Sequence, residues 1–328
     1  LASSAASDVY KRQYGTGRVR LVREYIVEAT GLDHAAYFER VTIGDHAEGY
    51  VDAVRQDSVL IALTRMDEKV KVGDRVVATG KEFSAQFSPL STGHIVDIFG
   101  EDKLAGKRLD ELKDIPIEGE PIPIMDRIAV TRPLHTGIMG IDMLYPIGRG
   151  QRQLIVGDKK TGKTQIALDT ILNQRGEDIL CIYVAIGKTK KEVKDIYSQL
   201  LCRGAMEYTI IVAAFNDDCA PVLQSTPYAA LSIAETYLRE GKDVLVVLDD
   251  LKRHADVCRE IALLMEKTPG RDAYPPDIFY AHSRMLELGC QHKNGGSITV
   301  LPICETKGGD ITDFISTNII SITDGQIA

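Results

Sequence analysis

The sequence predicts an α/β fold in which a small β-barrel domain precedes a larger domain built on a parallel sheet. Residues 14–81 contain short apolar runs separated by Gly-Asp or acidic turns, which is typical of a compact all-β domain. In residues 82–328, strand-like apolar runs alternate with amphipathic helical segments, as a parallel sheet requires. One of these strands and the next helix flank a G-x-x-x-x-G-K-[ST] pattern. At 328 residues the chain is long enough for two such domains.

The barrel prediction depends on short strands without intervening helices. Strand-like runs lie at residues 18–22, 38–43, 59–63 and 70–77. The preceding residues, 1–13, have neither the apolar core of a signal peptide nor a link to the strand-like runs after them. We expect them to be a non-native tail.

The larger domain opens with linker-like segments and continues as a regular alternation. The linker-like segments are residues 93–106 and 115–123. We expect strands at residues 153–156, 179–186, 208–214, 244–248 and 297–303. Helices are expected after Lys163, from Pro227, whose ring suits a first turn, and around Ile261. The sequence stops at Ala328 directly after a Thr-Asp-Gly-Gln turn, so we expect a domain that is truncated at its C-terminus.

Composition narrows the classes of partner. The 39 basic and 47 acidic residues give a net charge of -8, which disfavours nucleic acid and anionic membrane surfaces as partners. No run approaches the ~20 apolar residues that are needed to span a bilayer. We therefore expect no nucleic-acid partner, and a membrane role only through other proteins.

The clearest chemical motif is a phosphate-binding pattern. It consists of Gly157, Asp158, Lys159, Lys160, Thr161, Gly162, Lys163 and Thr164. Its glycines let backbone N–H groups curl around phosphate oxygens, and the N-terminus of the following helix adds its dipole. Lys163 adds a positive charge, and the Thr164 hydroxyl can bind magnesium. We predict that these eight residues bind the phosphates of a nucleotide.

An acidic residue stands where such domains hold a metal. Asp249 follows the apolar run 244–248, at the position of the carboxylate that binds magnesium directly or through water. Taken alone, an acid after a strand fits a helix N-cap equally well. Beside a phosphate loop the metal role is favoured, so we predict Thr164 and Asp249 as ligands of Mg²⁺. Asp250 is a neighbouring candidate.

Several runs carry a resemblance to a known family. Arg132-Pro133, residues 136–138 (TGI) and residues 145–152 (YPIGRGQR) lead into the phosphate loop and resemble rotary ATPase subunits. Four further runs are similar to the alpha subunit of F-type ATP synthases: residues 181–187 (CIYVAIG), 269–275 (PGRDAYP), 279–284 (FYAHSR) and 317–326 (TNIISITDGQ). The resemblance covers most of residues 14–327, strongly after Arg132 and weakly before it.

This resemblance implies a RecA-like P-loop nucleotide-binding domain after the barrel, with ATP or ADP and Mg²⁺ as ligands. It implies alternation with catalytic beta-type subunits in a hexameric ring around a central stalk. That ring couples an ion gradient to ATP synthesis or hydrolysis and is held peripherally at the cytoplasmic face of a membrane. The family also carries a helical C-terminal domain, which we expect to be absent from this sequence.

The resemblance further implies that the chain is non-catalytic and regulatory. The loop GDKKTGKT is closer to the alpha form than to the beta form. The catalytic subunit has a Glu that orients water where this chain has Lys188, and an ammonium cannot accept a proton. The family usually has Gln at that position and Arg-Gln where Lys159 and Lys160 stand. Lys160 and Lys188 either attract phosphates or point to solvent, as lysines usually do.

Arg284 matches the arginine that the alpha subunit projects into the neighbouring catalytic site. A planar guanidinium suits phosphate oxygens and stabilises charge on a transferring phosphoryl group. The resemblance therefore predicts Arg284 as a catalytic residue in trans. Its neighbour Ser283 is the accompanying candidate.

Two other functions remain open from the sequence. A self-sufficient rotary or export-type ATPase motor needs a water-positioning carboxylate, for which Asp217, Asp218 or Glu192 could substitute. An RNA-translocating RecA-like ring helicase needs basic surfaces with aromatic stacking residues. The barrel region instead mixes charges, and the chain has no Trp.

Overall fold

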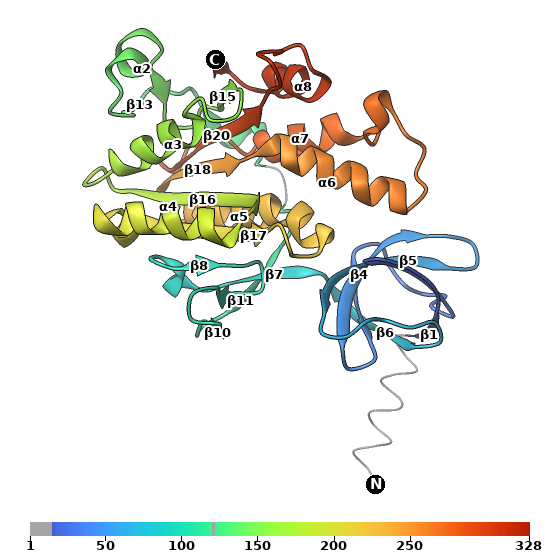
Figure 1. Ribbon diagram of the computed structural model, residues 1–328. Coiled ribbons are helices and arrows are strands. Elements are labelled where there is room, and N and C mark those ends of the chain that lie inside the picture. The colour runs from blue at the N-terminus through green and yellow to red at the C-terminus, as the bar shows by residue number, and fades with distance from the viewer. Residues whose placement is uncertain (1–14, 120–121) are drawn as a thin grey trace. The chain divides into compact units, whose positions relative to one another are not determined.

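The computed structural model describes residues 15–119 and 122–328, drawn in colour in Figure 1. The chain forms two compact units. The first runs to Ser84 and also takes in Cys219–Val222 and Arg259–Thr268, and the second contains the rest. The predicted tail at residues 1–13 lies outside the described residues. The predicted boundary between residues 81 and 82 stays a prediction.

The first unit contains a closed barrel of antiparallel strands, which confirms the predicted barrel. Its strands are β1 (Thr16–Arg23), β2 (Ile26–Thr30), β3 (Glu39–Ile43), β4 (Ala47–Val54), β5 (Val59–Met66) and β6 (Arg75–Glu82). They pair in the order β1-β2-β5-β4-β3-β6, and β1 closes the barrel on β6. Closure leaves no strand edge unpaired. Alternate side chains such as Val27, Val41 and Ile61 fill the interior.

Two details of the barrel differ from the sequence prediction. β2 and β4 were not predicted, because polar residues and Gly49 interrupt their apolar pattern. The strand expected at residues 70–77 begins only at Arg75. Before it lies a turn in which Gly73 has φ 95° and the Asp74 carboxylate accepts the Lys71 N–H at 2.7 Å.

The second unit is built on a sheet whose central strands are parallel, and it confirms the predicted α/β class. From one side of the sheet to the other, these strands are β17 (Thr209–Phe215), β16 (Ile179–Lys188), β18 (Asp243–Asp249), β20 (Ser297–Glu305), β15 (Gln153–Gly157) and β21 (Gly325–Ile327). Short strands extend the sheet or pair beside it: β7 (Ser84–Phe87), β8 (Ile95–Val96), β9 (Glu101–Asp102), β10 (Lys107–Arg108), β11 (Lys113–Pro116), β12 (Arg127–Ile128), β13 (Pro133–Leu134), β14 (Ile147–Gly148) and β19 (Cys290–His292).

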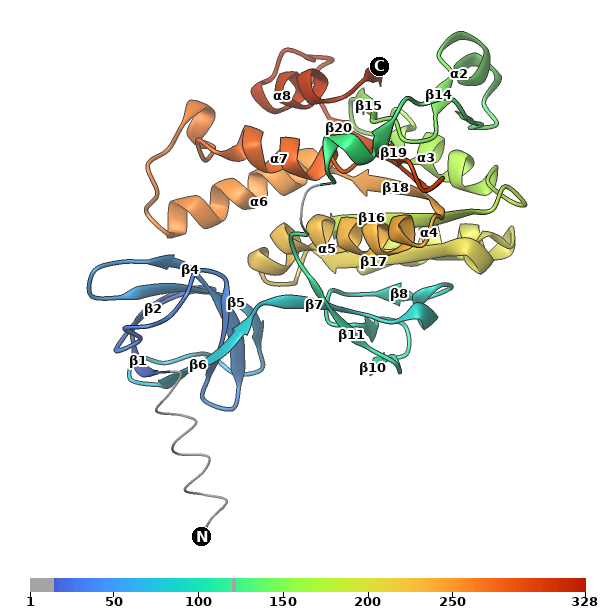
Figure 2. The same cartoon turned by 180° about the vertical axis from the view of Figure 1, so that it is seen from behind.

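Helices cover both faces of this sheet, as Figures 1 and 2 show from opposite sides. They are α2 (Met139–Leu144), α3 (Lys163–Leu172), α4 (Lys190–Cys202), α5 (Ala220–Arg239), α6 (Leu251–Leu264), α7 (Ile278–Leu286) and α8 (Phe314–Ile322). The 3-10 helices in the described part of the chain are η1 (Pro89–Ser91), η2 (Ile124–Asp126), η3 (Ala205–Tyr208) and η4 (Arg271–Ala273). α3 and α4 pack on the sheet face that carries Cys181, Tyr183 and Leu245.

Two sequence predictions for this unit were wrong. The helix expected to begin at Pro227 begins at Ala220, and Pro227 lies inside it. The chain turns earlier, where the Asp218 carboxylate accepts the Phe215 N–H at 2.7 Å. The segment 93–106 is not a linker, because β8 and β9 join the main sheet. No helix in the described ranges has the length and apolar character to cross a bilayer.

Candidate functional site

The phosphate-binding pattern forms the connection between β15 and α3. β15 ends at Gly157, and α3 begins at Lys163. Gly162 caps the helix with φ 98°, a left-handed conformation that glycine adopts without strain. The loop therefore lies at the carboxyl edge of the parallel strands, with the N-terminal N–H groups of α3 open to an anion.

Hydrogen bonds within the loop fix its shape. The Asp158 carbonyl oxygen accepts the Thr161 hydroxyl at 2.8 Å and the Lys163 ammonium at 2.5 Å. The Asp158 carboxylate accepts the Thr306 hydroxyl at 2.6 Å and the Gly309 N–H at 2.9 Å. These hydrogen bonds, that from Thr306 foremost, lower the pKa of Asp158. The Asp158 carboxylate therefore faces the segment after β20 that contains Thr306 and Gly309.

The other two lysines of the loop are exposed. Lys159 Nζ lies 3.4 Å from Glu305 Oε1, and its side chain is 78% exposed. Lys160 has φ 65° and is exposed as well. Neither lysine is held in a fixed position by burial.

Asp249 lies at the end of β18 with its carboxylate buried, at 3% exposure. The Thr164 hydroxyl donates to Asp249 Oδ2 at 2.9 Å, although 85 positions separate the two residues. The Tyr183 hydroxyl donates to the same oxygen at 2.5 Å. Burial, reinforced by the charge of Asp249, raises the pKa of Tyr183 well above its usual value, so this hydroxyl remains a donor.

Lys188 completes this cluster. Its ammonium lies 3.1 Å from Asp249 Oδ1, and its side chain is only 18% exposed. The interpretation of Lys188 as a solvated lysine is therefore wrong. Sequence reasoning also missed Tyr183, whose only signal was its place in the run CIYVAIG.

The neighbouring acid has a different task. Asp250 Oδ1 accepts the Arg253 N–H at 2.6 Å, which is the N-cap interaction of α6. Burial raises the pKa of Asp250 to about 6. The sequence left open whether an acid after β18 caps the next helix. In the structure Asp250 is the N-cap residue, while Asp249 faces Thr164.

The cluster around Asp249 has the donor types of a magnesium site but not the room for a directly bound ion. Hydroxyl and carboxylate oxygens such as those of Thr164 and Asp249 are the ligands that Mg²⁺ prefers. However, the Lys188 ammonium stands where a cation on Asp249 Oδ1 would lie. The residues present therefore do not fit Mg²⁺ coordinated directly by Asp249, and the predicted metal role stays a prediction.

Arg284 and Ser283 lie on α7, and their side chains contact residues outside this cluster. Arg284 Nη1 is 3.1 Å from Glu118 Oε2, and the arginine side chain is 36% exposed. The Ser283 hydroxyl donates to Glu287 Oε1 at 3.0 Å. Arg284 lines a cavity of about 280 Å³ together with Glu118 and Tyr228, and no residue of the phosphate loop lines it.

Two buried histidines join α7 to α6. His254 Nε2 lies 3.1 Å from the Gln224 carbonyl oxygen and must donate to it. His254 Nδ1 is then the acceptor for His282 Nε2, at 3.2 Å. Burial lowers the pKa of His254 to about 4 and that of His282 to about 3. Both rings are neutral in the folded protein near neutral pH.

We expect the free energy of unfolding to fall by about 1–2 kcal/mol between about pH 7 and about pH 5.5. The ordinary histidine pKa of 6.5 exceeds both folded values, so this stability is complete above pH 6.5 and is lost as the pH falls. The raised pKa of Asp250 has the opposite effect, but two histidines outweigh one carboxyl. Urea unfolding at several pH values measures how the free energy of unfolding changes with pH. The variant His34→Gln, at an exposed histidine, should show the same pH dependence as the wild type. A free energy of unfolding that does not change with pH would contradict the prediction.

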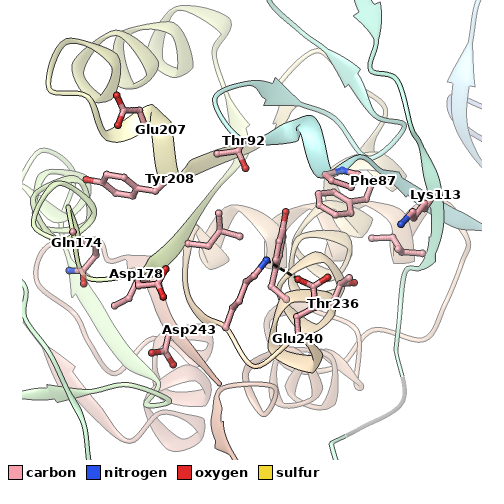
Figure 3. Close-up of a pocket in the computed structure, with 17 residues that line it drawn as sticks. Phe87, Thr92, Lys113, Gln174, Asp178, Glu207, Tyr208, Thr236, Glu240 and Asp243 are labelled. Carbon is pink, nitrogen blue, oxygen red and sulfur yellow. Dashed lines mark ion pairs between the residues drawn. The ribbon is translucent and has the colours of Figure 1, made fainter. Parts of the chain in front are cut away.

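A larger cavity, of about 800 Å³, lies at the opposite edge of the sheet (Figure 3). Its lining includes Ile179 and Asp243, the first residues of β16 and β18. Figure 3 shows Asp178, Glu207 and Asp243 among its acidic side chains. No phosphate-loop residue lines it, so the loop and this cavity are separate places on the second unit.

Asp243 is also the partner of two arginines from the runs that carried the resemblance. Arg132 donates to both of its carboxylate oxygens at 2.7 Å, and Arg149 donates to Oδ2 at 2.9 Å. The Ser297 hydroxyl adds a hydrogen bond at 2.7 Å. Burial alone would raise the pKa of Asp243, but these hydrogen bonds, led by that from Arg132, lower it. The two arginines thus tie the segment before the phosphate loop to β18.

A parallel sheet with a phosphate loop between β15 and α3, preceded by a barrel, defines a RecA-like P-loop nucleotide-binding protein. The chain belongs to the ATP synthase alpha/beta family, whose nucleotide-binding domain matches residues 137–328.

Similar proteins indicate which subunit type within this family the chain resembles. The chain is 44% identical over 316 residues to a Lactobacillus acidophilus protein named ATP synthase subunit alpha, covering 95% of this chain and 62% of that protein. It is 43% identical over 324 residues to a Clostridium botulinum protein of the same name, covering 97% of this chain and 64% of that protein. The chain therefore spans less than two thirds of the length of these relatives.

Proposed function

We propose that this chain binds ATP or ADP at its phosphate loop and serves as a non-catalytic alpha subunit of an F-type ATP synthase. Its partners are catalytic beta-type subunits, which alternate with it in a hexameric ring around a central stalk. The complex couples an ion gradient to ATP synthesis or hydrolysis at the cytoplasmic face of a membrane, and the chain meets the membrane only through that complex. The observation that carries the non-catalytic role is Lys188 at the end of β16, in contact with Asp249.

The environment of Lys188 supports the absence of hydrolysis by this chain alone. A hydrolytic site needs a group that accepts a hydrogen bond from the attacking water, and an ammonium only donates. The carboxylates considered as substitutes have other partners. Glu192 accepts the Thr189 N–H and hydroxyl, Asp217 pairs with Lys190, and Asp218 accepts the Phe215 N–H.

The surroundings of Arg284 support a role outside the chain's own site. Its guanidinium is partly exposed and lies beside Glu118 rather than beside the phosphate loop. Such an arginine is available to a neighbouring subunit, in whose active site it can stabilise phosphoryl charge. We therefore propose Arg284 as a catalytic residue in trans, with Ser283 as its neighbour.

Replacing Lys163 with Ala should weaken ATP binding by roughly tenfold to a hundredfold, because one charge-assisted contact is worth about 1.5–3 kcal/mol. Isothermal titration calorimetry on the chain measures the affinity. Lys191→Ala, an exposed lysine on α4, is the matched control and should bind ATP as the wild type does.

Two results would contradict the proposal. An unchanged ATP affinity in Lys163→Ala would remove the phosphate-loop assignment. Sustained ATP hydrolysis by the chain alone, abolished by Lys163→Ala, would show a self-sufficient ATPase instead.

A further inference from the structure

We propose that the ammonium of Lys188 takes the place of a metal ion at Asp249, so that this chain binds its nucleotide without needing a divalent cation. The inference rests on the proposed nucleotide binding and concerns what accompanies the nucleotide. It makes Lys188 a residue that sets cofactor specificity.

The charges at the cluster support this assignment. A buried carboxylate is costly unless it is paired and hydrogen-bonded. Asp249 meets both needs from the protein alone, because Lys188 supplies the charge while Thr164 and Tyr183 supply hydrogen bonds. A metal ion bound to the Asp249 carboxylate would lie close to the Lys188 ammonium. Two cations so close together repel each other strongly in a poorly hydrated site.

The backbone fixes where Lys188 points. β16 and β18 are parallel neighbours, and Ala185 lies opposite Asp249, so β16 continues beyond the end of β18. Gly187 has φ 65°, and a Cβ added there would lie 2.9 Å from Arg253 Nε. The Lys188 carbonyl oxygen then accepts the Asn216 N–H at 3.1 Å. The turn at Gly187 therefore directs the Lys188 ammonium over the end of β18. Any residue with a side chain at position 187 would strain the backbone of this turn.

The ligand chemistry follows from the cations at the loop. A nucleoside di- or triphosphate without metal carries more negative charge than its magnesium complex. Lys163 at the start of α3 and the helix N-terminus offer positive charge to the phosphates. Lys188 neutralises Asp249, the acid that accepts the hydroxyl of Thr164 in the loop. Without Lys188, Asp249 would repel a metal-free polyphosphate, and a divalent ion would be needed between them.

The test compares ATP affinity, by calorimetry, in excess Mg²⁺ and in excess EDTA. The wild-type chain should bind ATP equally in the two media, to within about threefold. Lys188→Gln should bind at least about tenfold more weakly in EDTA than in Mg²⁺. Lys190→Gln, an exposed lysine paired with Asp217 on the protein surface, is the control and should behave like the wild type.

The outcomes separate this inference from the proposed function. If the wild-type chain binds ATP well in Mg²⁺ and at least about tenfold more weakly in EDTA, the inference is overturned and the nucleotide site stands. If ATP binds in neither medium, both are overturned. The wild-type comparison can overturn the inference even if Lys188→Gln folds poorly. If both the wild-type chain and Lys188→Gln bind ATP equally in Mg²⁺ and in EDTA, groups other than Lys188 make binding independent of metal. That result also overturns the inference.

Discussion

Replacing Arg284 with Ala is expected to lower the kcat of an assembled ring by about 10³-fold or more, while this chain's own nucleotide affinity changes much less. The guanidinium would meet charge that develops mainly in the transition state of the neighbouring site. Ground-state binding at the chain's own phosphate loop does not involve it, because Arg284 lies beside Glu118. The effect should therefore be visible only in the complex.

The experiment combines the mutant protein with a wild-type catalytic partner and measures multisite turnover alongside the mutant's own ATP affinity. Arg284→Lys should rescue turnover only in part, because a point charge cannot reproduce the planar fork. Arg203→Ala, an exposed arginine after α4, is the matched control. Normal turnover in Arg284→Ala would make Arg284 a surface or structural residue. A collapse of the chain's own affinity would show that it acts in cis.

Replacing Asp243 with Ala is expected to lower the free energy of unfolding by about 2–4 kcal/mol. The change removes the carboxylate that Arg132 and Arg149 share, and among the described residues Arg149 keeps only Glu177, at 2.9 Å, as an ionic partner. A buried charge that loses a partner is destabilising. The expected loss of stability is smaller than for a fully buried ion pair because the Arg132 side chain is 38% exposed.

Urea unfolding of the chain measures this change. Asp217→Ala removes an acid from an exposed ion pair with Lys190 and should cost less than about 1 kcal/mol. Equal effects of the two variants would show that the Asp243 cluster contributes no more than an ordinary surface pair.

Local patterns made the phosphate loop and the alternation of strands and helices predictable. Gly162 and Lys163 are recognisable from spacing within eight residues, and the buried strands are long enough to show a pattern. β8 and β9 have two residues each, which is too short for any periodicity. Their place in the sheet depends on pairing with distant segments.

The contact between Lys188 and Asp249 could not be predicted for a similar reason. It requires that β16 and β18 be neighbours in the sheet, whereas β17 lies between them in the sequence. It also requires the register that places Ala185 beside Asp249. Side-chain type suggested a solvated lysine or a phosphate contact, and only the strand order distinguishes these from an ion pair with the acid.

The length of β18 limits how this family member can change. The strand has seven residues, with Asp243 at one end and Asp249 at the other, so the two carboxylates lie on the same face roughly 20 Å apart. Removal or insertion of a single residue would turn one acid to the opposite face and break either the arginine cluster or the pair with Lys188. This strand can therefore diverge by substitution between its ends but not by change of length. A compound in the cavity beside Asp243 would also be too distant to touch a phosphate at the loop.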